Sequence, residues 1–225
     1  MHIEPGIVDG AKIVLSYATA VGAAGYALKL SLDTMREKGI SSLIIRSVFT
    51  TVLVFCFFQV LPHYPVGVSE VHFILGSTLF LLFGVAPAAI GLAAGLLLQG
   101  ALFAPGDLPQ YFINITTLLV PLFALQYLAA RIIKRDTAYV DLKYTQALAL
   151  SAAYQGGIVA WVMFWAFYGQ GFGAENISNV LSFSGAYMLV ILVEPLVDLA
   201  VLAVVKTMRK LENSGVFTPR LFQVA

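Results

Sequence analysis

Charged side chains are scarce in this sequence. They make up 11% of its 225 residues, whereas a soluble domain carries roughly 25%. Apolar residues make up 60%, the mean hydropathy is +0.88, and several stretches exceed the ~18 apolar residues that predict a spanning helix. These features exclude a soluble domain and predict an all-α, polytopic membrane protein. The net charge of +1 points to no charged partner, and no nucleic acid is expected as one.

Cysteine is nearly absent. The single residue, Cys56, lies inside an apolar run, which excludes a disulfide framework and a cysteine-based metal site. The phosphate-binding pattern G-x-x-x-x-G-K-[ST] is also missing, and the three histidines form no recognisable catalytic set. We therefore expect a protein that is not an enzyme, uses no organic cofactor and does not hydrolyse ATP itself.

The hydrophobic residues fall into seven segments, which predict about seven transmembrane helices in one integral membrane domain over residues 1–225. The segments are 9–31, 40–61, 71–84, 86–104, 111–133, 145–169 and 183–206. As one helix, residues 71–104 would be ~51 Å long against a hydrocarbon core of ~30 Å. Gly84 and Pro87 are therefore predicted to mark a bend. Residues 1–8 precede the bundle of residues 9–206, and residues 207–225 form a tail.

Lysine and arginine predict the orientation, because cytoplasmic loops are enriched in them. Twelve of the thirteen basic residues lie in three regions: the first connection, the fifth-to-sixth connection and the C-terminal tail. With seven spans, these regions lie on the same side of the membrane. The residues are Lys29, Arg36, Lys38 and Arg46; Arg131, Lys134, Arg135 and Lys143; Lys206, Arg209, Lys210 and Arg220. The exception is Lys12. The C-terminus is thus predicted to be cytoplasmic. The N-terminus and the loops 61–71, 104–111 and 169–183 are predicted to lie outside.

The sequence opens MHIEPG, and this start suggests a metal chelate. It lacks the features of a cleaved signal peptide, so Met1 is expected to keep a free amine. That amine, the His2 amide nitrogen and the His2 imidazole can form fused chelate rings on Ni(II), Cu(II) or Co(II). Another imidazole, from His63 or His72, would complete a planar site. All three histidines fall on the predicted outer side. The alternative is a terminal histidine that binds nothing.

The start MHIEPGIVDG, the loop and helix LPHYPVGVSEVHFILGSTLF, and the stretches QGALF and DLPQYFINITTLLVPLF resemble one known family over roughly residues 1–130. They are similar to substrate-specific (S) components of energy-coupling-factor (ECF) transporters for nickel and cobalt, of the CbiM/NikM type. This resemblance implies a multi-pass protein of the bacterial plasma membrane. It also implies Ni(II) or Co(II) as the transported substrate. The implied partners are a transmembrane coupling subunit, ATP-binding subunits and a small accessory membrane subunit.

The resemblance further implies that the metal is held by Met1, His2 and His72. His72 matches the family's later histidine because it precedes the glycine-containing helix. His63 and Asn114 are left as supporting or alternative residues: His63 as a loop histidine that is not needed as a ligand, and Asn114 as a residue that orients a loop or an imidazole. The sequence departs from the family pattern at Ser-Glu-Val before His72 and at Phe-Ile-Asn around Asn114.

Two carboxylates lie within the last hydrophobic segment. Glu194 and Asp198 are four residues apart and therefore share a helix face, with Pro195 as a bend between them. Intramembrane carboxylates are costly and suggest function. They could relay protons or cations, or they could pack against a neighbouring helix or a partner subunit. No basic residue is predicted at their depth.

Small residues recur at four-residue spacing, which permits close helix contact. The pairs are Ala18/Gly22, Ala20/Ala24 and Gly91/Gly95. The first two pairs either pack inside the bundle or, by the resemblance, contact the coupling subunit.

Together these patterns predict a subunit that captures Ni(II) or Co(II) for ATP-driven uptake. The alternative is a self-sufficient ion- or proton-coupled secondary carrier that uses Glu194 and Asp198, with the N-terminal histidine incidental. The secondary carrier is less favoured because no internal repeat is evident.

Overall fold

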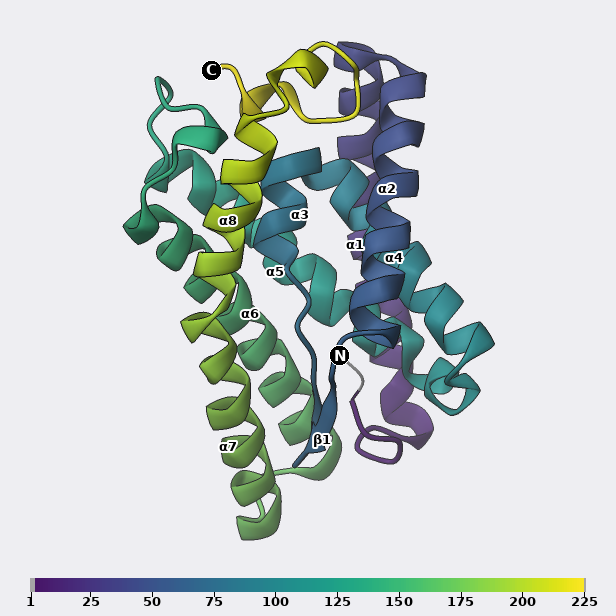
Figure 1. The fold of residues 1–225 in the computed structure, drawn as a ribbon. Coiled ribbons are helices and arrows are strands. Elements are labelled where there is room, and N and C mark those ends of the chain that lie inside the picture. Colours follow the sequence, from purple (N-terminus) through teal and green to yellow (C-terminus); the bar gives the residue numbers. More distant parts are fainter. Residues whose placement is uncertain (1–2, 225) are drawn as a thin grey trace.

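The computed structural model describes residues 3–224, which form a bundle of long helices running between two ends (Figure 1). Within residues 3–224, six stretches are helical, apolar and long enough to cross a membrane. They are Gly10–Lys38, Ile40–Gln59, Val85–Leu102, Pro105–Ile132, Tyr144–Gln170 and Ala174–Lys206. These helices confirm the all-α, polytopic prediction, with one long helix fewer than the seven predicted segments.

The helices are joined by short turns at the two ends of the bundle. The 3-10 helix η1 (Gly10–Ile13) leads into α1 (Val14–Lys38), and Gly39 separates α1 from α2 (Ile40–Gln59). Gly39 ends α1 because its φ of +80° leaves the helical region. Past α4 (Val85–Leu102) come η2 (Pro105–Gln110), α5 (Tyr111–Ile132), η3 (Tyr139–Asp141) and α6 (Tyr144–Gln170).

The third hydrophobic segment does not form a long helix. The preceding residues make a hairpin of β1 (Tyr64–Val66) and β2 (Ser69–Val71), and the segment itself contains only α3 (Gly76–Phe83), whose eight residues are all buried. A helix of this length spans only ~12 Å. Residues 72–75, which have no regular secondary structure, connect the hairpin to α3. Gly84, with a φ of +87°, makes the predicted bend into α4.

The predicted outer loop 169–183 is wrong in extent, because α7 (Ala174–Met188) begins within it. Hydropathy misses this helix since it is amphipathic: its buried residues are Asn176, Val180, Phe183 and Tyr187, at helical spacing. A 3-10 turn, η4 (Leu189–Leu192), joins it to α8 (Glu194–Lys206), and Pro195 lies in the first turn of α8. The predicted bend therefore separates two helices.

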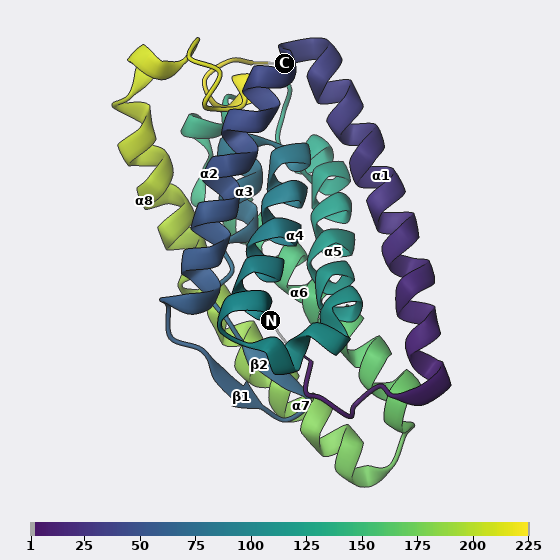
Figure 2. The ribbon, with the colours of Figure 1, turned by 90° about the vertical axis from the view of Figure 1, so that its right-hand side faces the viewer.

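The glycine pair on α4 packs inside the bundle. A Cβ atom on Gly91 would lie 2.3 Å from Thr50 Oγ1, and one on Gly95 would lie 2.6 Å from Val54 Cγ1. These glycines therefore let α2 and α4 approach closely. By contrast, a Cβ on Gly22 of α1 would meet nothing within 4 Å. Figure 2 shows α1 along the outside of α4 and α5.

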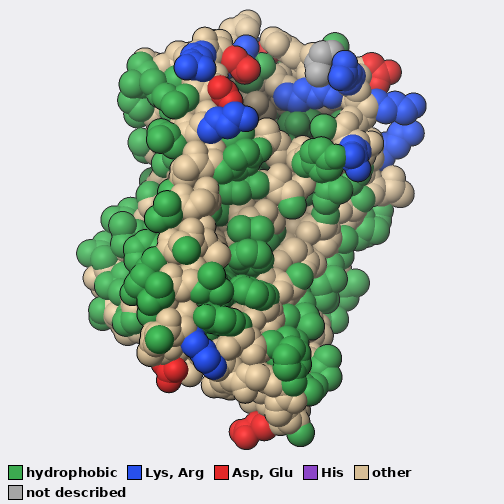
Figure 3. All heavy atoms as spheres, turned by 180° about the vertical axis from the view of Figure 1, so that it is seen from behind, with side chains coloured by type: hydrophobic (Ala, Val, Ile, Leu, Met, Phe, Trp, Pro, Cys, Tyr) green, Lys and Arg blue, Asp and Glu red, His purple; other side chains and the backbone are tan. Residues whose placement is uncertain are grey.

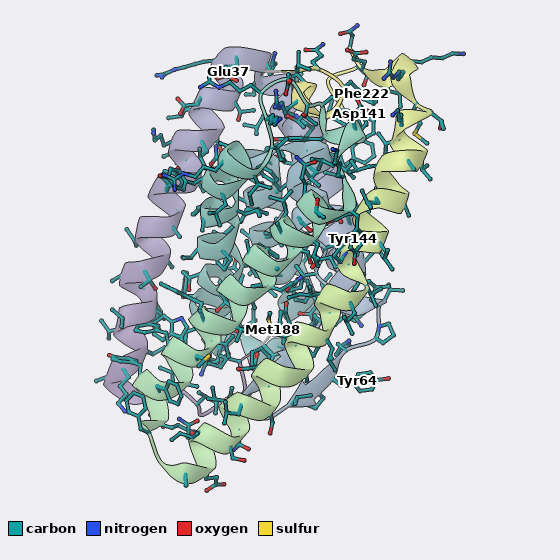
Figure 4. All side chains as sticks on the ribbon, turned by 90° about the vertical axis from the view of Figure 1, so that its left-hand side faces the viewer. Glu37, Tyr64, Asp141, Tyr144, Met188 and Phe222 are labelled. Atoms are coloured by element: carbon teal, nitrogen blue, oxygen red, sulfur yellow. The ribbon has the colours of Figure 1, made fainter. Side chains whose placement is uncertain are left out.

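The two ends of the bundle differ in charge. The basic end is formed by residues 36–40, the connection 133–143 and the C-terminal residues 207–224; the hairpin end is formed by β1, β2, η2 and residues 171–173. Figure 3 shows Lys and Arg gathered at the basic end, with a single basic side chain near the other end on that face. In Figure 4, Glu37, Asp141 and Phe222 lie at the basic end, and Tyr64 lies at the hairpin end.

The C-terminal residues fold back over the basic end. The 3-10 helix η5 (Arg209–Leu211) precedes a turn, and η6 (Pro219–Leu221) places Leu221 in the core. Thr218 N–H donates to the Leu82 carbonyl over 2.8 Å and so satisfies the carboxyl end of α3.

Cysteine labelling tests the predicted orientation. In a Cys56→Ser background, Pro65→Cys and Gly173→Cys should react with an impermeant maleimide added to intact cells, because the positive-inside rule places the hairpin end outside. Asp136→Cys should react only after the membrane is opened. Position 136 is exposed, whereas Val140 beside it is buried and would be a poor reporter. Labelling at position 136 in intact cells would reverse the predicted orientation.

Candidate metal-binding site

The segment that follows His2 is held against the hairpin. Ile3 forms a bridge with Ser69, and Glu4 N–H donates to the Val68 carbonyl over 3.0 Å. Ile3 N–H donates to Asn114 Oδ1 over 2.8 Å, in a buried hydrogen bond. Three groups thus fix the backbone directly after His2, and Asn114 is one of them.

Asn114 is well placed for this role. It lies in the first turn of α5 and is 1% exposed, so its side chain has a fixed direction. Further along the N-terminal segment, Gln110 Nε2 donates to the Val8 carbonyl over 3.0 Å, and Val8 is fully buried. The start of α5 therefore anchors both ends of residues 3–8.

His72 lies directly after β2 and is buried, with 2% of its surface exposed. Its Nε2 lies 2.8 Å from Glu70 Oε2. A histidine that binds a metal typically donates its other ring N–H to a carboxylate, which fixes the tautomer and strengthens the ligand. The contact to Glu70 holds the His72 ring in one orientation through its Nε2.

Two aromatic rings hold the His72 imidazole. The Phe58 ring lies 4.9 Å away, centroid to centroid, and the His63 ring stacks on it at the same distance and within 8° of parallel. His63, predicted to be a loop histidine not needed as a ligand, is exposed yet packs directly on His72.

The carboxylates near the N-terminal segment make this end electronegative. Burial raises the pKa of Glu4, and the neighbouring charges of Glu70 and Asp107 raise it further. Such a field attracts cations to the hairpin end. Glu70 and Asp107 were not singled out from the sequence, although the two-residue spacing of Glu70 and His72 along extended backbone places both on one face.

The predicted ligands Met1 and His2 lie outside the described residues. The structure places Ile3 beside Ser69, three residues before His72, so the chain immediately after His2 and the predicted third ligand come together at one end of the bundle. Within residues 3–224, no group of three or more His, Cys, Asp or Glu side chains is arranged to hold a metal.

Glu194 and Asp198 form a second polar centre in the interior. Both are fully buried on one face of α8, as the spacing predicts. Ser151 Oγ donates to Glu194 over 2.6 Å, Gln155 donates to the same carboxylate, and Thr78 donates to Asp198. Ser77 Oγ lies 3.2 Å from Glu194 Oε1 and 2.8 Å from Asp198 Oδ2.

The carboxylates therefore bind neighbouring helices of the same chain and do not face a partner subunit. Ser77 and Thr78 belong to α3, and Ser151 and Gln155 belong to α6. The hydrogen bonds therefore join α8 to the short helix α3 and to the long helix α6. The donors are hydroxyls and an amide, consistent with the predicted absence of a basic residue at this depth.

Most of the chain matches one known protein family. A family model described as "cobalt uptake substrate-specific transmembrane region" (CbiM) matches residues 2–211. The chain belongs to the CbiM family. The match extends the predicted resemblance from about residue 130 to residue 211, and thus includes α8 with its carboxylates. No curated protein and no solved structure matches the chain.

Membership fixes the general role. A CbiM protein is a multi-pass component of a transport system and not an enzyme, and it works with other membrane and ATPase subunits. Cobalt is the substrate that the family description gives.

Proposed function

We propose that this CbiM chain captures Co(II) or Ni(II) at the hairpin end for ATP-driven ECF-type uptake. The proposal rests on the contacts of Ile3. Its N–H donates to Asn114, and it forms a bridge with Ser69 in the strand that precedes His72. This anchoring would hold a chelate formed by the preceding two residues next to a buried imidazole.

The proposed ligands are the Met1 amine, the His2 amide and imidazole nitrogens, and a ring nitrogen of His72. Four nitrogens in a plane suit Ni(II), which can displace the amide proton, and Co(II) is a related candidate. The contact between His72 and Glu70 supports this assignment because it resembles the carboxylate–histidine pairs found around metal sites. The electronegative rim would raise the local cation concentration.

Release would require loss of this geometry. The N-terminal segment lies against the hairpin, and residues 73–75 connect His72 to α3. Movement of the bundle against a coupling subunit, driven by ATPase subunits, would disturb the planar nitrogen set or allow the amide to regain its proton.

The proposed coupling surface is the outer face of α1, which carries Ala18 and Gly22. This helix is the least buried of the six spans, and its Val21 and Leu28 side chains are 73% and 61% exposed. Small residues without neighbours permit close approach of another helix. An accessory membrane subunit is a further expected partner.

The alternative is a secondary carrier that uses Glu194 and Asp198. Both carboxylates are buried within the bundle, and intramembrane carboxylates often belong to ion pathways, which is the observation in favour of this alternative. The structure gives both groups partners within the chain, which favours a role in holding α3.

Asn114 provides a test of the anchoring. Asn114→Leu should weaken binding of Co(II) and Ni(II) by about tenfold to a hundredfold, because a residue that orients a ligand commonly contributes this much. Asn114→Asp keeps an oxygen at the acceptor position and should retain most of the affinity. Isothermal titration of the purified protein measures both. Equal affinity in Asn114→Leu and the wild type would show that the Ile3 anchor does not position a metal ligand.

A further inference from the structure

A cavity of about 550 Å³ lies at the basic end, at the opposite end of the bundle from the proposed metal site. Its walls come from α1, α2, α5, the α3–α4 bend and the C-terminal segment. The groups that matter for binding are Lys38, Arg46, Arg135 and Arg220, which are basic, and Asp33 and Glu37, which are acidic. The cavity therefore carries a surplus of positive charge.

Arg46 is the central feature of this cavity. It is 2% exposed, and its Nε and Nη1 donate to the carbonyls of Ser42 and Phe83 over 3.2 and 2.9 Å. Its Nη2 is buried without a hydrogen-bond partner among residues 3–224, and no ion pair links Arg46 to a described acidic side chain. Burial of a guanidinium is costly, and an anion that accepts from the unused donor would offset that cost.

A helix end adds to this preference. The first turn of α4, with Val85 and Pro87, lines the same cavity, and no side chain caps it. The amino terminus of an 18-residue helix attracts anions through its dipole and its unpaired N–H groups, which here are those of residues 85 and 86 because Pro87 has none. Arg220 contributes charge, while its two terminal nitrogens bind the carbonyls of Lys134 and Arg135.

The remaining polar groups indicate a ligand that also donates hydrogen bonds. Gln126 Oε1 lines the cavity and is a buried acceptor without a partner in the described part of the chain. Asp33 and Glu37 provide further acceptors on the α1 wall. These carboxylates would repel a simple dianion. A monoanionic phosphodiester with hydroxyl groups would accept hydrogen bonds from the basic side chains through its phosphate and donate hydrogen bonds to the carboxylates through its hydroxyls.

We propose that this cavity binds the headgroup of an anionic phospholipid, a phosphodiester that carries a polyol such as glycerol. Arg46 Nη2 and the amino terminus of α4 take the phosphate, and Gln126 with the α1 carboxylates takes the hydroxyls. The location supports the lipid source, because the cavity lies at the basic end of a membrane bundle, where the headgroups of anionic lipids gather and basic pockets between helices hold them. The proposal does not depend on metal binding.

Native mass spectrometry and thermal unfolding of the full chain in detergent test this assignment, with added phosphatidylglycerol, phosphatidylcholine or inorganic phosphate. Phosphatidylglycerol should bind and raise the melting temperature, and phosphatidylcholine should do neither. Arg46→Gln should weaken phosphatidylglycerol binding by about tenfold or more, as expected for a buried charged hydrogen bond. Arg135→Gln should weaken phosphatidylglycerol binding by a few-fold. Because Arg135 is exposed, this variant is expected to fold normally, so its loss of binding cannot be attributed to misfolding.

Arg131→Gln is the matched control, since Arg131 lies at the same end, is exposed, and does not line the cavity. It should leave lipid binding within twofold of the wild type. If Arg131→Gln and Arg46→Gln lost the same affinity for phosphatidylglycerol, the effect would come from the general surface charge, and the proposal would be overturned. Saturation by inorganic phosphate without a lipid preference would overturn the lipid source. Dependence on Arg46 only within the assembled transporter, with no lipid effect, would assign the cavity to an acidic partner chain.

Discussion

His72→Ala is expected to reduce the affinity of the purified protein for Ni(II) and Co(II) by at least about a hundredfold, more than the loss of a residue that only orients a ligand. The imidazole is buried, oriented by Glu70 and packed between Phe58 and His63. Its removal would leave the proposed chelate with three nitrogens and an open corner. Isothermal titration with Ni(II) measures this directly.

The controls for this prediction separate ligands from neighbours. His2→Ala and acetylation of the Met1 amine should weaken binding as strongly as His72→Ala. His63→Ala removes a stacking partner and should cost only a few-fold in affinity. Unchanged affinity in both His2→Ala and the acetylated protein would rule out the N-terminal chelate.

Adding one residue before Met1 tests whether the position of the native amine matters. The amine then lies one residue further from His2, and amine, two amides and imidazole make a four-nitrogen chelate without His72. Binding in solution should survive, whereas uptake by cells should fail because the metal is no longer fixed to the bundle. Normal uptake by the extended protein would contradict the requirement for a native amine.

Glu194→Leu is expected to destabilise the bundle strongly. It leaves the buried donors of Ser151 and Gln155 without their acceptor, at about 1–3 kcal/mol for each. Together the two losses amount to about 2–6 kcal/mol, and the melting temperature in detergent should fall by about 4–24 °C, since 1 kcal/mol corresponds to about 2–4 °C in a protein of this size. Glu175→Leu, at an exposed position of α7, is the matched control and should shift it by less than about 3 °C.

The milder replacements Glu194→Gln and Asp198→Asn address function. They retain an acceptor and should leave Ni(II) affinity unchanged, because the proposed site lies at the hairpin end. Loss of metal binding in a folded Glu194→Gln, Asp198→Asn protein would move the site into the bundle and favour the secondary carrier.

The long helices and the bend were predictable because continuous apolar runs and the Gly84–Pro87 pair are local signals. The amphipathic α7 and the short α3 were not: hydropathy averages over a window, and α3 depends on side chains from α6 and α8 that no local pattern reveals. The spacing of Glu194 and Asp198 predicted their shared face, but not that Ser77 and Thr78 would meet it.

For the candidate site, too, some residues were predictable from the sequence and others were not. His72 and Asn114 were named from motifs, and the structure adds the backbone hydrogen bond that links Asn114 to Ile3. Glu70 was missed because its role depends on the register of a two-stranded hairpin, which the sequence specifies only weakly. The positions of Met1 and His2 remain predictions.

The capping of α3 by Thr218 has a consequence for biosynthesis. The ribosome makes α3 well before the residues that complete its contacts: the Thr218 N–H that satisfies the Leu82 carbonyl, and the α8 carboxylates that bind Ser77 and Thr78. A helix of eight residues is too short to be stable alone in lipid. Residues 71–84 are therefore expected to complete their crossing only after α8 and Thr218 have been made. A nascent chain that stalls before residue 198 would lack the carboxylate that accepts from Ser77 and Thr78, and its third crossing would stay incomplete.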